Sequence, residues 1–223
     1  MLYDFHCHTF LSDGELSPVE LIRRASVRGY RAIGVADHVG IGGYAEIIRQ
    51  VSQDCVLCAR YWKIVAVPAV EITHVPPPAI AEVARACKEA GARIVIVHGE
   101  TPVEPVEPGT NRAAVHCPDV DVLGHPGFLS QEEVEIAAAN GVFFELTPRR
   151  GHSITNGHVA RIARSAGVRL IVNSDGHSPG DLLTEELARR VALGAGLDEN
   201  EADIALHQNP RLLLERVGVR LPD

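Results

Sequence analysis

The stretch Leu2-Tyr3-Asp4-Phe5-His6-Cys7-His8 shows the pattern that decides the fold, because a strand-forming apolar run ends in two histidines. Six further runs of this kind follow, and each also ends in polar residues. They end at Asp37-His38, Glu71, His98, His125, Glu145 and Asp175-Gly176-His177. Continuous Val/Ile/Ala runs are typical of parallel strands that are buried on both faces. We therefore expect seven parallel strands with polar side chains at their carboxyl ends.

Helical segments separate these runs. Ser17-Pro18-Val19-Glu20 is a capping box with proline at the first helical position, and it predicts a helix over 18–28. Further helices are predicted near 44–60, 79–90, 110–116, 130–139, 154–166, 180–195, 198–206 and 209–216. The strands between them are predicted at 3–7, 32–36, 64–70, 93–97, 120–123, 142–144 and 169–172. Seven strand-then-helix units with right-handed crossovers predict a closed or nearly closed α/β barrel, with 1–223 as a single domain.

A doubly wound open sheet is the rival architecture. Such a sheet places its ligand site at one reversal of strand order and uses the loops of only a few strands. In this chain, candidate ligands follow at least six of the seven predicted strands. Only a barrel brings all of them to one mouth, where TIM-type barrels also carry their chemistry.

Composition limits the class of protein. With 223 residues and 46% hydrophobic content, the chain can bury the core of one α/β domain. Five cysteines without framework spacing predict a reducing compartment, and Cys55-x-x-Cys58 is expected to be a packing pair. No apolar run approaches the roughly 18 residues of a membrane span, and no signal segment precedes His6. We expect a cytoplasmic protein without a membrane partner.

The charge predicts the kind of binding partner. The formal charge is −8, and no run of lysines or arginines occurs. Duplex binding usually needs a basic face, so no duplex nucleic-acid partner is expected, whereas a small phosphorylated substrate in a local pocket fits the composition. The sequence sets no oligomeric state.

The histidines point to metal binding. His6 and His8 are two apart on a strand, so both side chains leave the same face while Cys7 points away. Four more histidines and two acids occupy the equivalent place after other strands: His38, His98, His125, His177, Glu71 and Asp175. Imidazole with carboxylate is the ligand mixture for Zn, Mn or Fe. The other histidines, namely His74, His116, His158 and His207, are expected to be ordinary surface or structural residues.

These motifs resemble a known family. The motifs are His6-x-His8-Thr9, Ser12-Asp13-Gly14, Ala36-Asp37-His38, Glu71, His98, His125-Pro126-Gly127 and Asp175-Gly176-His177-Ser178-Pro179. In this order, over nearly the whole chain, they resemble the PHP (polymerase and histidinol phosphatase) domain family, in the form of a stand-alone archaeal or bacterial phosphoesterase. The resemblance implies a distorted (β/α)7 TIM-like barrel that holds two or three divalent metal ions.

The resemblance also implies the ligands of each ion. The first metal would take His6, His8, Glu71 and Asp175. The second would share Glu71 and add His98 and His125. The third would take Asp13, His38 and His177. Some members of the family have histidine where this chain has Asp13, so the donor set of the third site differs from theirs.

Such a pocket suits phosphate chemistry. Three carboxylates contribute −3 and three divalent ions +6, which leaves about +3 at the mouth of an acidic protein. A hydroxide bridging the first two metals is expected to attack phosphorus in line, while the third metal holds the phosphoryl oxygens. The predicted activity is that of a metal-dependent phosphoric ester hydrolase, acting on a small phosphomonoester such as histidinol phosphate or a nucleotide-like molecule.

Residues after the sixth strand are expected to assist. Arg149 or Arg150 could pair with a phosphate through its planar fork, and His152 could protonate the leaving oxygen. Alternatively, these residues order their loop against Glu145 and Asn156. Asp37 is predicted to orient its neighbour His38.

Three other functions compete with this prediction. An amidohydrolase-type C–N hydrolase also begins with HxH and ends with Asp, but it usually has eight strands and often a bridging modified lysine. A ribonuclease P-type RNA-associated scaffold shares a related barrel and need not keep the ligands. A DNA polymerase module is disfavoured because no polymerase signatures appear, so a free-standing enzyme is expected.

Overall fold

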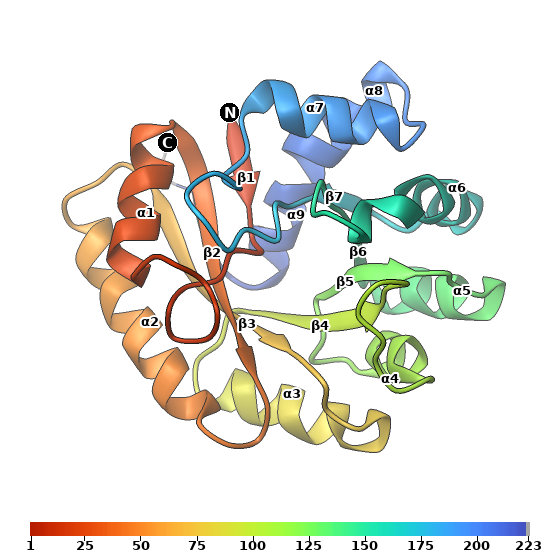
Figure 1. The fold of residues 1–223 in the computed structure, drawn as a ribbon, viewed down its shortest axis with the longest axis horizontal. Helices are drawn as coiled ribbons and strands as arrows, with labels where there is room; N and C mark the ends of the chain where they lie inside the picture. Colours follow the sequence, from red (N-terminus) through yellow and green to blue (C-terminus); the bar gives the residue numbers. More distant parts are fainter. Residues whose placement is uncertain (222–223) are drawn as a thin grey trace.

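A computed structural model describes residues 1–221 and shows a parallel barrel (Figure 1). Seven strands pair in chain order. They are β1 (Leu2–Asp4), β2 (Tyr30–Val39), β3 (Val65–Ile72), β4 (Ile94–Glu100), β5 (Val122–Gly127), β6 (Phe143–Leu146) and β7 (Leu170–Val172). Past the ends of β1 and β7, the main chains meet again, because His8 N donates to Gly176 O at 2.8 Å. The sheet is therefore nearly closed, which confirms the predicted fold.

The first strand is shorter than predicted. Residues 3–7 were expected to form it, but regular pairing with β2 ends at Asp4. Beyond that point, side chains accept the main-chain hydrogen bonds: Phe5 N donates to Asn173 Oδ1 at 2.9 Å, and His6 N donates to Asp4 Oδ1 at 3.3 Å. Cys7 keeps a single bridge to Gly176. The ligand-bearing end of this segment is thus held by these side chains and by main-chain bonds: Gly176 N donates to His6 O at 3.2 Å, and Ala36 N donates to Cys7 O at 2.8 Å.

Helices surround the sheet (Figure 1). The crossover helices are α1 (Pro18–Val27), α2 (Tyr44–Ala59), α3 (Ile80–Glu89), α4 (Thr110–His116), α5 (Gln131–Asn140) and α6 (Asn156–Ala166). The short helices η1 (Pro77–Ala79) and η2 (His152–Thr155) precede α3 and α6. The predicted capping residue Ser17 lies at the start of α1, where its side chain accepts from Glu20 N; Ser130 likewise caps α5 by accepting from Glu133 N.

The chain ends in α7 (Glu185–Gly194), α8 (Glu199–Asp203), η3 (Ile204–Gln208) and α9 (Asn209–Arg216). A helix was predicted from residue 180, but α7 begins five residues later. Asp181 instead accepts hydrogen bonds from His177 N and Ser178 N, and the side chain of Thr184 caps the helix. Residues 180 and 181 therefore remain in a loop at the mouth.

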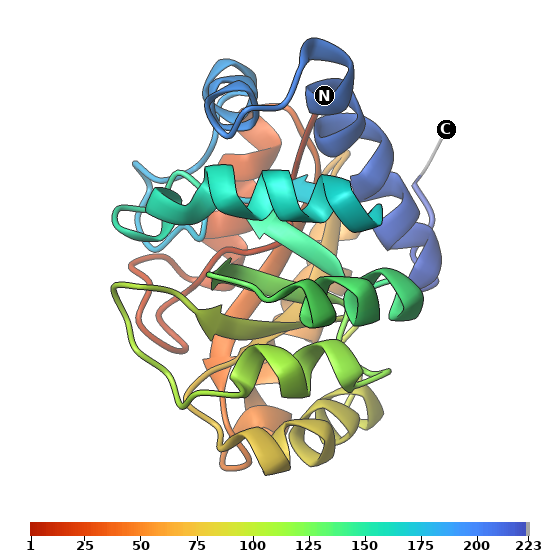
Figure 2. The same cartoon turned by 90° about the vertical axis from the view of Figure 1, so that its right-hand side faces the viewer.

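Two apolar clusters fill the molecule. The larger one lies between strands and helices and includes Cys55 and Cys58. The smaller one fills the barrel with side chains such as Phe5, Ala69 and Ile96, and Leu213 and Leu214 of α9 join it at the amino-terminal end. The long loops after the strands gather at the opposite end, on the left in Figure 2, with α9 on the right. One end of the barrel is thus closed by apolar side chains, and the other is left to the loops.

Within residues 1–221, no helix has both the length and the apolar character needed to cross a bilayer.

Candidate metal centre

The structure brings all nine predicted metal ligands to the carboxyl end of the barrel. Four groups of residues each offer ligand atoms within 4.8 Å of one another. These groups are His8, Asp13, His38 and His177; His6, Glu71 and His125; His6, His8 and Asp175; and His125, His152 and Asp175. His98 joins through Nδ1, which lies 3.3 Å from Glu71 Oε1.

Glu71, at the end of β3, lies at the centre of the cluster. Its Oε1 atom is 3.3 Å from His6 Nε2 and also 3.3 Å from His125 Nε2. Its other oxygen is 2.8 Å from His38 Nδ1. Asp175 approaches from the segment after β7, with Oδ1 3.3 Å from His8 Nε2 and Oδ2 3.6 Å from His125 Nε2. One buried carboxylate thus contacts histidines from several strands, the geometry needed to share it between two ions.

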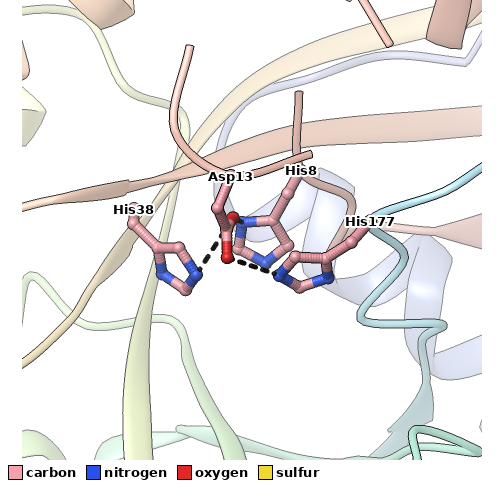
Figure 3. Close-up of side chains that lie close together, drawn as sticks. All are labelled: His8, Asp13, His38 and His177. Atoms are coloured by element: carbon pink, nitrogen blue, oxygen red, sulfur yellow. Dashed lines mark ion pairs between the residues drawn. The ribbon is translucent and has the colours of Figure 1, made fainter. Parts of the chain in front are cut away.

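Asp13 lies at the centre of the most exposed of these four groups, which also contains His8, His38 and His177 (Figure 3). Its two oxygens lie 3.4 Å from His38 Nε2 and 3.2 Å from His177 Nε2. His8 lies beside them, with Nδ1 3.9 Å from Asp13 Oδ1. The Asp13 side chain is 55% exposed, whereas that of Glu71 is 1% exposed. A cation here would face solvent and incoming substrate.

Unpartnered buried atoms test whether these residues fit metal ions. Among residues 1–221, eight buried side-chain nitrogen or oxygen atoms lack a hydrogen-bond partner. Seven of the eight belong to predicted ligands, namely His6, His8, Glu71, His98 and His125. Each such atom costs roughly 1–3 kcal/mol unless something satisfies it. Divalent ions would do so, and the donor set of imidazole and carboxylate suits them.

The main chain is also constrained here. Three non-glycine residues of the described chain have a positive φ, and two of them are His125 (26°) and Asp175 (52°). Such conformations cost free energy and cluster at functional sites.

Protonation in the cluster is mixed: burial alone would lower the pKa of His6, His38 and His125, but nearby carboxylates raise it, so these rings must release a proton to bind a metal. Burial alone would raise the pKa of Glu71, yet the charges of His6 and His98 bring it well below its usual value. Burial lowers the pKa of His8 to about 4. At neutral pH Glu71 is therefore a carboxylate and His8 a neutral imidazole, the forms that coordinate metals.

Glu145, within β6, orients the predicted ligand His6 from the side away from Glu71. Its Oε2 atom lies 2.7 Å from His6 Nδ1 and accepts from Asn173 Nδ2 at 2.9 Å. Its other oxygen accepts from His125 N at 3.3 Å. This contact fixes the His6 ring with Nε2 toward Glu71, as carboxylates behind metal-bound histidines commonly do.

The predicted role of Asp37 is wrong. Its carboxylate does not contact His38 but accepts from Thr9 N at 2.8 Å, from Thr9 Oγ1 at 2.7 Å and from Ser12 Oγ at 2.7 Å. His38 is held instead by Thr73, whose Oγ1 lies 2.7 Å from His38 Nδ1. Adjacent residues on a strand point to opposite faces, so Asp37 fixes the loop that carries Asp13.

The three predicted assisting residues line a cavity of about 820 Å³ beside the cluster. Arg149 Nε lies 3.7 Å from Asp175 Oδ2. Arg150 lines the same cavity, and His152 Nε2 lies 3.8 Å from Asp175 Oδ2. The alternative was that these residues order their loop against Glu145 and Asn156. Asn156 does bond to this loop, but through the main-chain N and O atoms of Thr147 rather than through Arg149, Arg150 or His152.

Sequence reasoning missed two residues. Glu104 lines this cavity and also a second one of about 480 Å³, and its Oε2 atom is 3.5 Å from His98 Nε2. His74 was expected to be ordinary, but it has a φ of 55° and lines the second cavity. The available signal was their position in loops after β3 and β4.

No model of a known protein family matches the chain. Uncharacterized protein MJ1295 of Methanocaldococcus jannaschii is 47% identical over 218 residues, which is 97% of this chain and 100% of that protein. This chain belongs to the MJ1295 family. Two other relatives match in part. Ribonuclease P protein component 3 of Methanosarcina mazei is 32% identical over 138 residues, 55% of each chain. A 5'-3' exoribonuclease of Haemophilus influenzae is 48% identical over 44 residues, 20% of this chain and 16% of that protein.

Solved structures share the fold of this MJ1295 relative. A chain of archaeal ribonuclease P with mature tRNA has a TM-score of 0.72 at 14% identity, over 99% of this chain and 96% of that one. A Listeria monocytogenes protein assigned as a histidinol phosphatase has a TM-score of 0.56 at 10% identity, over 81% and 97%. A zinc-bound adenosine deaminase of Xanthomonas campestris has a TM-score of 0.58 at 12% identity, over 96% and 66%. At these identities the similarity shows the fold alone.

The expectation of no duplex nucleic-acid partner is contradicted by these findings. Ribonuclease P component 3 is a partial sequence relative, and a ribonuclease P chain solved with mature tRNA is a full-length fold relative. The inference failed because a formal charge of −8 averages over the whole surface and does not describe the mouth of the barrel.

Proposed function

We propose that this protein is a metal-dependent phosphoesterase that hydrolyses a phosphomonoester of nucleotide-like character. The observation that carries the proposal is the buried Glu71 carboxylate, surrounded by histidines from other strands with unpartnered ring nitrogens. Two or three Zn, Mn or Fe ions would be held by His6, His8, Asp13, His38, Glu71, His98, His125, Asp175 and His177.

The ions would supply an activated water and positive charge for the phosphoryl oxygens. Residues of the chain would do the rest. Arg149 and Arg150 would bind a second group of phosphate or ribose oxygens in the adjoining cavity. His152 would stabilise the leaving oxygen by a hydrogen bond from Nε2, which faces the cluster, since Thr101 Oγ1 engages its Nδ1 at 2.7 Å. Burial lowers the pKa of His152 to about 4, so the neutral ring does not supply a proton at pH 7.

Two observations favour phosphate over C–N bond hydrolysis. The group around Asp13 adds a third cation position at the exposed side of the cluster, where it would hold phosphoryl oxygens. The chain has only two lysines, Lys63 and Lys88, neither of which can supply a bridging modified lysine. Lys88 contacts Asp121, and Lys63 precedes β3 while Glu71 lies near its end.

An RNA-associated role is the second candidate. It is supported by the TM-score of 0.72 to a chain of archaeal ribonuclease P with mature tRNA and by the partial match to component 3. The two candidates are compatible if the hydrolysed phosphate belongs to a nucleic acid.

The test is hydrolysis of p-nitrophenyl phosphate by metal-stripped protein to which Mn or Zn is added back. We expect activity that depends on added metal and falls at least 100-fold in both His6→Ala and Glu71→Ala. His116→Ala, which changes an exposed histidine of α4, is the matched control and should be fully active. Unchanged activity in the first two variants would show that the site is assigned wrongly.

A further inference from the structure

Exposed phenylalanines stand at the mouth of the barrel. The chain has five phenylalanines. Phe5, Phe143 and Phe144 are buried in the apolar clusters, whereas Phe10 is 59% and Phe128 68% exposed. Both exposed rings follow a ligand motif directly: Phe10 comes two residues after His8, and Phe128 three residues after His125. Since they add nothing to the core, their place beside the metal centre calls for another explanation.

Both rings sit on rigid supports. Phe10 N donates to Leu16 O at 2.9 Å, and Gly14 closes the same loop by donating to Thr9 O at 2.8 Å. A Cβ atom at Gly14 would lie 2.5 Å from His8 O, so the loop packs tightly on the strand end. Phe128 meets the edge of the His158 ring, with centroids 5.3 Å apart and an interplanar angle of 64°. A ring fixed in this way can receive a ligand without losing much conformational entropy.

Two arginines lie between the two rings, in a cavity whose lining also includes Glu104 and Asp181; Arg149 Nη1 lies 3.7 Å from Asp181 Oδ2. Around the mouth, the loop after β1 carries Phe10, the loops after β7 and β6 follow, and the loop after β5 carries Phe128. The two middle loops supply most of the lining of the 820 Å³ cavity, including Arg149 and Arg150. A ligand that spans the mouth on this side would therefore meet an aromatic ring, then arginines beside the metal centre, then a second aromatic ring.

We infer that Phe10 and Phe128 are stacking platforms for the bases of a single-stranded nucleic acid. Its phosphates lie along Arg149 and Arg150 and on the metal centre. A single strand combines flat apolar bases with regularly spaced anions, which is the order of chemistry found around this mouth. This inference rests on the proposed function, because it places a terminal phosphomonoester of the strand at the metal centre.

Binding of a 3'-fluorescein-labelled 2'-O-methyl penta-adenylate to the Mn-loaded protein, followed by fluorescence anisotropy, tests the inference. Stacking contributes roughly 1–3 kcal/mol per base, so Phe10→Ala and Phe128→Ala should each raise Kd at least about 5-fold. Phe128→Trp should keep the affinity. Tyr61→Ala is the control, since Tyr61 is 75% exposed and follows α2 at the other end of the barrel.

A labelled abasic phosphate chain of the same length separates stacking from general damage. The alanine variants should lose the preference for penta-adenylate over the abasic chain. Wild-type affinity for penta-adenylate in both variants, equal losses for the two probes, or no binding by the wild-type protein would each overturn the inference. Ring-dependent binding without any p-nitrophenyl phosphate hydrolysis would instead uphold the platforms and refute the proposed activity.

Discussion

At the amino-terminal end of the barrel, each oxygen of the buried Asp121 carboxylate has a partner. At the carboxyl end, buried imidazoles and Glu71 face one another, and several of their nitrogen and oxygen atoms have no hydrogen-bond partner. Asp121 Oδ2 accepts from Lys88 Nζ and from Val95 N, and Oδ1 lies 3.6 Å from Arg216 Nε. Around Glu71, two of the three nitrogens nearest the unpartnered Oε1 atom, His6 Nε2 and His98 Nδ1, are themselves unpartnered.

This contrast separates polar groups that stabilise the fold from polar groups that bind. A buried polar network is favourable only when all of its members are satisfied. The network around Asp121 meets that condition within the chain. The cluster around Glu71 can satisfy its buried polar atoms only with cations. Mutation at Glu71 should therefore reduce activity and ion content, whereas mutation at Asp121 should reduce stability and leave the ion content unchanged.

The largest contrast is expected in activity. Glu71→Gln keeps the shape of the side chain but removes the charge shared between two predicted ion positions. Metal stabilisation of a phosphoryl transition state is worth several kcal/mol, so kcat/KM should fall about 1000-fold. Elemental analysis of the purified variant should show fewer bound ions. Full activity with normal ion content would remove Glu71 from the site.

The second-largest effect is expected on stability, when the metal ions are removed. A ligand present at 100 to 1000 times its Kd stabilises the folded state by about 2.7–4.1 kcal/mol. For a domain of this length, chelation should therefore lower Tm by roughly 5–16 °C, as measured by calorimetry. The same shift should occur in Asp121→Asn, whose change lies at the other end. A Tm that is indifferent to chelator would mean that the cluster is satisfied without ions.

Loss of the structural carboxylate should have a similar or slightly smaller effect. Asp121→Ala removes the carboxylate that pairs with Lys88 and leaves Lys88 Nζ only Arg93 O as a partner, and breaking a buried ion pair costs about 3 kcal/mol or more. Because the Lys88 side chain is 25% exposed, the low end is expected, with a Tm decrease of roughly 6–12 °C. Ion content per folded protein should not change. Reduced ion content would show that the two ends are coupled.

The smallest effect is expected from Glu145, which contacts the predicted ligand His6 but is not itself a predicted ligand. Glu145→Gln weakens the hold on His6, and such partners typically change metal affinity 10- to 100-fold. Titration of stripped protein with Zn, monitored by calorimetry, should show this loss. Glu135→Gln, on the exposed face of α5, is the matched control and should bind as the unmodified chain does.

The sequence predicted most of this arrangement because the strands repeat one pattern. Helix bounds such as 110–116 and 209–216 agree with the structure, since caps and apolar periodicity are local signals. The site residues could be named because each follows a strand. Asp37 was misread because its partners lie in another loop, and Glu104 escaped because the course of residues 101–109 depends on tertiary contacts. The inference from net charge to binding partner failed for a similar reason, because it ignored where the charged side chains lie on the surface.

Anomalous diffraction from crystals grown with Mn²⁺ tests the central claim most directly. We predict at least two anomalous peaks at the carboxyl end of the barrel, one of them bound by Glu71 together with His98 and His125. Mn²⁺ found only at surface carboxylates, with the imidazoles around Glu71 packed against one another as direct partners, would contradict the account.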